Sequence, residues 1–172
     1  MSRDQRTPLG AIAQGIAAGL VGTAIFTGFQ ALTSKLAGGG DSGGGTPRDW
    51  SETPEPAQVG QRVAEGVFQA DVSPQKHAAL LANVTHWVYG TSWGALYGAA
   101  RETWRPHPLA LGPAQGGIVT VADYTLLPLM NLYEPPWRYR AKTLAKDLAN
   151  HVVYGLAVAG AYQALEAIRH RL

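Results

Sequence analysis

The sequence contains no cysteine, and this absence removes several kinds of chemistry at once. A chain without thiols cannot form disulfides, use a cysteine nucleophile or bind a metal through sulfur. The sequence also has no phosphate-binding loop, no H-E-x-x-H pattern and no G-x-S-x-G pattern. It therefore gives little support to enzyme chemistry of the soluble type, and we expect no catalytic residues, no cofactor and no resident metal.

Charged residues are missing from four long windows of the chain. These windows are residues 7–34, 77–100, 106–133 and 148–165. Asp123 is the only Asp, Glu, Lys or Arg residue in them. A helix that crosses a bilayer needs about 20 predominantly apolar residues. A surface helix of a soluble bundle should instead carry a polar stripe along its exposed face. The windows therefore predict membrane helices over about 9–34, 77–100, 109–133 and 141–168.

Two of these windows share a sequence pattern. The stretch NVTHWVYGTSWGALY begins at Asn83, and NHVVYGLAVAGAY begins at Asn150; both contain H-x-V-Y-G with a tyrosine seven residues after the glycine. The other two windows share a shorter Ala-Gln-Gly element, centred on Gln14 and Gln115. We therefore predict an all-α fold, a polytopic membrane four-helix bundle built from two repeated helical hairpins. It would form a single membrane domain over residues 1–172.

The segment between the first two windows has a different composition. Residues 37–55, AGGGDSGGGTPRDWSETPE, are rich in glycine, serine and proline, and this is typical of a linker that is flexible in its early part. Over about 56–70, Val59, Val63, Val67 and Phe68 recur at helical spacing, which predicts a short amphipathic helix. Such a helix lies on a membrane surface or docks on the bundle as a solvated helix, and both interpretations stay open.

Small residues four positions apart mark faces on which helices can approach closely. In lipid, this close packing drives helix association. The helix-packing residues that we predict are Gly15, Gly19, Gly90, Gly94, Gly98 and Gly155.

Three ionisable residues inside the windows are the candidate functional residues. An aspartate at the centre of a membrane helix costs roughly 2.5–3.5 kcal/mol, so Asp123 should face the bundle interior or a water cavity. If the hairpins repeat, His86 and His151 lie at similar depth, on helices antiparallel to that of Asp123. The three side chains are then a proton or cation site, since histidine titrates near neutrality. The alternative is a set of interhelical hydrogen bonds, and two histidines alone do not complete a zinc site.

The partners follow from charge and hydropathy. A formal net charge of +2 is too small to indicate nucleic acid, and the basic residues cluster at the ends of the apolar windows, where membrane flanks place them. We expect the lipid bilayer as the main partner, and a second copy or another membrane protein remains open. Basic residues occur on both sides of the predicted membrane helices, so they predict the orientation of the chain only weakly. The orientation that we favour has both termini in the cytoplasm.

Several stretches carry a family resemblance that covers most of the chain beyond the glycine-rich linker. They are DWSETPEPAQVGQRVAEGVF, HWVYGTSWGALYG, ADYTLLPLMNLYEPPWRYRAKTLAKD and HVVYG. Together they resemble the YagU-like group of small bacterial inner-membrane proteins and their actinobacterial relatives. The resemblance implies a multi-pass helical protein of the cell inner membrane and brings no catalytic residues with it.

Two functions from different classes are therefore expected. The first is a membrane module that moves or senses protons or a small solute through the Asp123, His86 and His151 cluster. The second is a structural or partner-binding membrane protein whose polar residues only hold helices together. A bis-histidine haem carrier is a third and weaker reading, which a visible haem absorption band would identify.

Overall fold

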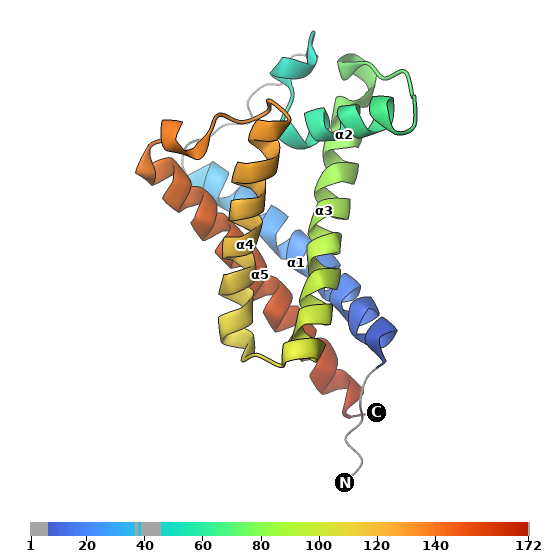
Figure 1. The fold of residues 1–172 in the computed structure, drawn as a ribbon, viewed down its shortest axis with the longest axis vertical. Helices are drawn as coiled ribbons and strands as arrows, with labels where there is room; N and C mark the ends of the chain where they lie inside the picture. Colours follow the sequence, from blue (N-terminus) through green and yellow to red (C-terminus); the bar gives the residue numbers. More distant parts are fainter. Residues whose placement is uncertain (1–6, 37, 39–45, 172) are drawn as a thin grey trace. The chain divides into compact units, whose positions relative to one another are not determined.

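The chain is helical throughout the part that its structure describes. A computed structural model describes residues 7–36, 38 and 46–171, and these contain five α-helices, two short 3-10 helices and no strand. The all-α class predicted from the sequence is thus confirmed. The elements, labelled in part in Figure 1, are α1 (Pro8–Leu36), η1 (Trp50–Glu52), α2 (Glu55–Gly66), α3 (Pro74–Trp104), α4 (Pro108–Leu129), η2 (Pro136–Arg138) and α5 (Ala141–Arg169).

One difference in helix bounds is at the end of α4, which stops at Leu129 instead of near residue 133. Asn131 has a positive φ of 53°. This left-handed residue lets the Leu132 N–H donate to the Leu127 carbonyl at 2.9 Å and the Asn131 N–H donate to the Pro128 carbonyl at 3.0 Å. Two such bonds around a left-handed residue form a helix-terminating motif. Pro128 therefore lies in the last turn of α4, just before the helix ends.

Only one helix of the described residues, α1, has both the length and the apolar character needed to cross a membrane. A signal sequence or the core helix of a soluble protein can share that property. The sequence windows predicted four spans, and the other long helices differ for a physical reason. α3 and α5 include Lys76, Arg101 and Lys146, and α4, although 22 residues long, is made less apolar by Gln115 and Asp123.

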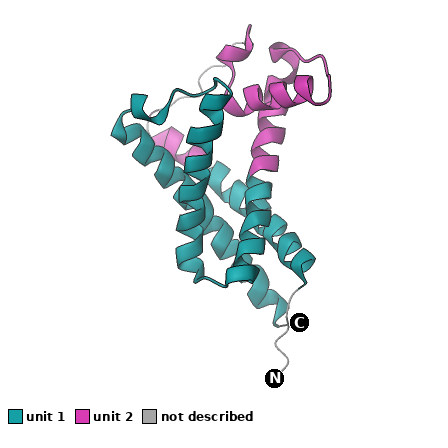
Figure 2. Cartoon of the chain, in the orientation of Figure 1, with its two compact units in different colours: residues 1–29, 90–172 teal, residues 30–89 magenta. Residues whose placement is uncertain are grey.

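The chain forms two compact units, coloured separately in Figure 2. Unit 1 comprises residues 1–29 and 90–172, and unit 2 comprises residues 30–89. The helices α1 and α3 each contribute residues to both units. The single domain expected from the sequence therefore has an internal division, and each unit is described by itself.

Unit 2 contains the linker end and α2. The early part of the linker is the part predicted to be flexible. Its residues 37 and 39–45 lie outside the described residues. The described part is ordered by local bonds, since the Asp49 carboxylate accepts the Ser51 N–H at 2.9 Å and caps η1. This bond lowers the pKa of Asp49 below its usual value, so the cap is weakened only as the pH falls through that lowered pKa.

The side of α2 that packs in unit 2 is lined by small residues. Its buried residues are Ala57 and Gly60, and a Cβ added to Gly60 would lie 2.7 Å from the Thr85 hydroxyl of α3. Val63 of α2 is 44% exposed, and Val67 and Phe68, which follow the helix, are 69% and 74% exposed. α2 therefore docks on α3 through small residues, and the larger apolar side chains at its end remain on the outer surface.

Unit 1 is packed through glycine. A Cβ added to Gly19 of α1 would lie 3.0 Å from the Gly94 Cα of α3, and one added to Gly15 would overlap the Gly94 carbonyl. Likewise, the Ala11 carbonyl occupies the space that a Cβ on Gly98 would need, and the Thr23 side chain occupies the space that a Cβ on Gly90 would need. The backbones of α1 and α3 therefore touch, and only glycine allows this approach.

The same kind of contact joins α4 and α5, which lie side by side. A Cβ on Gly155 would overlap the Gly112 carbonyl, and one on Gly116 would lie 2.7 Å from the Val152 Cα.

The outer surfaces are apolar. The exposed large side chains of α1, α4 and α5 in unit 1 include Ile16, Leu20, Val21, Ile25, Ile118, Val121, Leu126 and Leu156.

Candidate functional site

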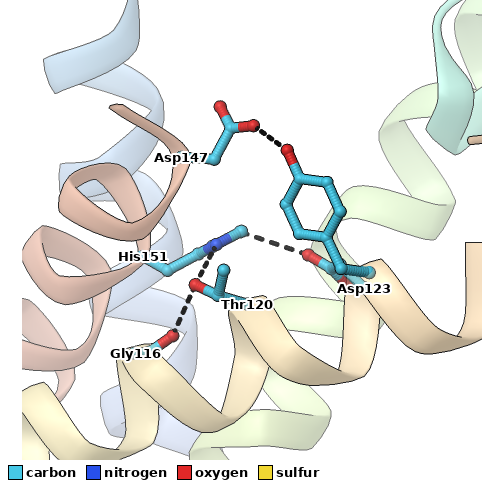
Figure 3. Close-up of polar contacts among 6 residues, drawn as sticks. Gly116, Thr120, Asp123, Asp147 and His151 are labelled. Atoms are coloured by element: carbon cyan, nitrogen blue, oxygen red, sulfur yellow. Dashed lines mark hydrogen bonds and ion pairs between the residues drawn. The ribbon is translucent and has the colours of Figure 1, made fainter. Parts of the chain in front are cut away.

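Asp123 of α4 and His151 of α5 face each other across the closely packed pair of helices (Figure 3). The His151 Nε2 atom lies 3.3 Å from the Asp123 Oδ2 atom, and the two side chains are 21% and 19% exposed. The short distance depends on Gly116, because any larger residue there would push α4 away from the His151 carbonyl. The glycine contacts thus bring the two ionisable groups together.

Thr120 contacts the imidazole. Its hydroxyl lies within hydrogen-bond distance of two acceptors, the Gly116 carbonyl at 2.9 Å and His151 Nδ1 at 3.0 Å. A hydroxyl has one hydrogen. When that hydrogen is donated to Gly116, as Thr often does within a helix, the oxygen accepts from a protonated Nδ1. When Nδ1 carries no proton, the hydroxyl donates to it instead.

The His151–Asp123 contact can hold one further proton when Nδ1 is protonated. The imidazole is then either neutral, with a bare Nε2, or a cation with both nitrogens protonated. In the first arrangement a protonated Asp123 carboxyl donates to the bare Nε2, and in the second an imidazolium pairs with the carboxylate. Both arrangements have zero net charge and differ only in which atom holds the proton. The pair can therefore pass a proton between Oδ2 and Nε2 without changing its own charge.

A second carboxylate lies one helical turn from His151. Asp147 of α5 accepts a hydrogen bond from the Tyr124 hydroxyl at 2.6 Å (Figure 3). The Tyr124 ring also packs against Tyr133 and Tyr139, with ring centroids 5.5 and 5.4 Å apart. This tyrosine cluster closes the side of the site where α4 ends and α5 begins.

Of the three candidate residues, the structure brings Asp123 and His151 together. His86 belongs to unit 2, where its half-buried ring stacks edge-on against Trp87 at 6.4 Å. The structure therefore describes a pair, and the predicted three-residue cluster stays a prediction.

Sequence reasoning did not single out Thr120, Tyr124 or Asp147. A usable signal was present, because Asp147 and His151 are four residues apart on one helix and therefore share a face. Asp147 lies just outside the charge-free window that begins at residue 148, so that window does not include it. In residues 7–36, 38 and 46–171, no three His, Asp or Glu side chains converge in a way that could hold a metal ion.

Comparison with known proteins adds no assignment to this geometry. No family model, curated protein or solved structure matches the chain.

Proposed function

We propose that this chain is a multi-pass protein of the cell inner membrane that handles protons at the Asp123–His151 pair. One observation carries the proposal: a histidine whose Nδ1 lies 3.0 Å from the Thr120 hydroxyl faces a carboxylate at 3.3 Å. Imidazole and carboxyl groups both bind and release protons, and imidazole is the side chain used most often for proton transfer in proteins. Their partial exposure leaves them open to exchange with water.

The membrane part of the proposal is supported by where polar and apolar side chains lie in unit 1. The outer surface of the helices carries Ile, Leu and Val, whereas the buried polar side chains include Thr23 and Gln115. This distribution suits lipid outside and polar contacts inside. Trp104 is the last residue of α3, and Trp137 lies in η2, shortly before α5. Both are highly exposed and lie where an aromatic belt would meet the bilayer interface. The likeness to the YagU-like group agrees with this placement.

Proteoliposomes test the proton-handling function directly. The purified chain would be reconstituted into vesicles that contain a pH-sensitive dye, and a pH step would be applied outside. We expect the internal pH to respond faster than in protein-free vesicles prepared from the same lipid. Identical responses in the two preparations would contradict the proposal.

The second candidate function is structural, and two glutamines favour it. The Gln14 amide donates to the Tyr162 carbonyl at 2.8 Å, and the Gln115 amide donates to the Trp93 carbonyl at 2.8 Å. Each side chain thus ties one helix to another, as an interhelical link in a membrane would. If proton flux is absent while the protein folds and inserts normally, this structural function is the better description.

The proposed topology predicts that both termini lie on one side of the membrane. The contact between Gln14 near the start of α1 and Tyr162 near the end of α5 supports this arrangement. Tags fused to the two ends should show equal accessibility to a membrane-impermeant label in intact cells. One accessible and one protected tag would rule out an even number of spans.

A further inference from the structure

We infer that unit 1 binds a file of water molecules that links the Asp123–His151 pair to Arg101 and Glu166, where α3 and α5 end. The inference rests on the proposed function, because the file is the route by which protons would reach or leave the pair. It adds three residues, Thr23, Gln115 and Tyr97, whose role is to hold this water.

Each of the three residues has a buried oxygen without a protein partner. Within the described part of the chain, these atoms are Thr23 Oγ1, Gln115 Oε1 and the Tyr97 hydroxyl oxygen. The residues are 1%, 5% and 2% exposed, so bulk water does not reach them freely. Buried polar atoms in proteins are normally satisfied, and an ordered water is the usual partner where protein atoms are not. Three such oxygens in one small unit therefore indicate bound water.

Thr23 lies one helical turn from a residue that contacts the pair. Its helix neighbour Phe26, one turn further along α1, packs against the His151 ring with centroids 6.4 Å apart. The Thr23 side chain also faces Gly90, whose carbonyl accepts the hydrogen bond from the Tyr154 hydroxyl. Thr23 therefore lies at the junction of α1, α3 and α5, next to the level of His151.

Gln115 and Tyr97 continue from that junction toward the ends of α3 and α5. The Gln115 amide nitrogen is held by the Trp93 carbonyl, so its oxygen is also fixed near α3. Tyr97 follows Trp93 by one helical turn and packs edge-on against Tyr162 at 5.5 Å. The Gln115 side chain of α4 is thus anchored to α3 one helical turn before Tyr97.

Charged groups stand at the far end of this series. Arg101 lies one turn beyond Tyr97 on α3, and its Nε is buried with no protein partner. Glu166 lies one turn beyond Tyr162 on α5, and both Arg101 and Glu166 act electrostatically on the Tyr97 phenol. On α5, Asp147 and Glu166 are 19 residues apart, or about 28 Å at 1.5 Å per residue. This length is close to the roughly 30 Å hydrocarbon core of a bilayer.

Two conservative substitutions test the inference. Tyr97→Phe and Thr23→Val each remove a hydroxyl that bonds to no protein atom and leave the shape almost unchanged. Thermal stability in detergent should change little, because side-chain packing is kept and only a hydrogen bond to water is lost. Proton flux in proteoliposomes should fall roughly tenfold, the effect of one lost hydrogen bond on a transfer rate. The control is Thr125→Val, whose exposed hydroxyl bonds only to the Val121 carbonyl of its own helix, and it should leave flux unchanged.

A second measurement does not depend on flux. Solid-state NMR of the wild-type protein in lipid should show magnetisation transfer from water to the side chains of Tyr97 and Thr23. No transfer, or wild-type flux in both variants, would overturn the inference, and so would loss of folding in either variant. If wild-type protein moves no protons at all, the proposed function fails, and the NMR transfer alone then decides whether the bound water exists.

Discussion

Asp123→Asn should abolish proton flux in proteoliposomes while leaving the protein folded. The Asn side chain has nearly the same shape, and its amide can donate to the bare Nε2 of His151, so the interhelical contact is kept. It cannot release a proton, however, and the pair loses its only acidic member. A positioned acid–base group contributes roughly 10²–10⁴-fold to a proton-transfer rate, and we expect a loss of at least about 100-fold across neutral pH.

A matched control separates the loss of titration from the loss of a charge. Asp71→Asn makes the same substitution in the exposed connection between α2 and α3, and we expect wild-type flux from it. Circular dichroism and thermal stability in detergent should be alike for the two variants. If Asp123→Asn carries protons as the wild type does at every pH, the pair is an interhelical link and the proton-handling function is wrong.

Gly94→Leu should prevent assembly of unit 1. A Cβ at this position would overlap the Gly19 Cα and lie 2.5 Å from the Gly15 carbonyl, and both obstacles are backbone. Overpacking usually costs about 1–3 kcal/mol when side chains can move, and backbone atoms yield less readily. We therefore expect a loss of stability at or above the upper end of that range, measured as a lower melting temperature in detergent.

Two controls test whether the effect comes from the packed face. Val88→Leu enlarges an exposed side chain on the same helix. Gly117→Leu makes the same exchange on α4, where an added Cβ meets no atom within 4 Å. The latter should be neutral or stabilising, since glycine is about 0.8–1 kcal/mol less favourable than alanine inside a helix. Equal losses for Gly94→Leu and Gly117→Leu would show that the glycine contacts do not hold α1 against α3.

Helix positions were predictable because they depend on local sequence. The scarcity of charged residues around His151 and Gly19, and prolines near helix starts such as Pro108, indicate helices without reference to any partner. The helix end at Leu129 was missed. Asn131 can adopt either a helical or a left-handed backbone conformation, and the left-handed one that ends the helix was not predictable from the local sequence. The contact of α2 with α3 was not predictable from the apolar pattern, since it is made through Gly60.

The sequence by itself determined that this chain is helical, that glycines such as Gly94 and Gly155 stand on helix faces, and that Asp123 is the lone acidic residue of an apolar window. Only the tertiary structure decided that His151 is its partner and that Thr120 holds the imidazole. The reason is physical: spacing along one helix defines a face, whereas the register between two helices is set where their backbones touch. The contact of Gly112 and Gly116 with α5 sets that register here, and it places the carboxylate beside the imidazole.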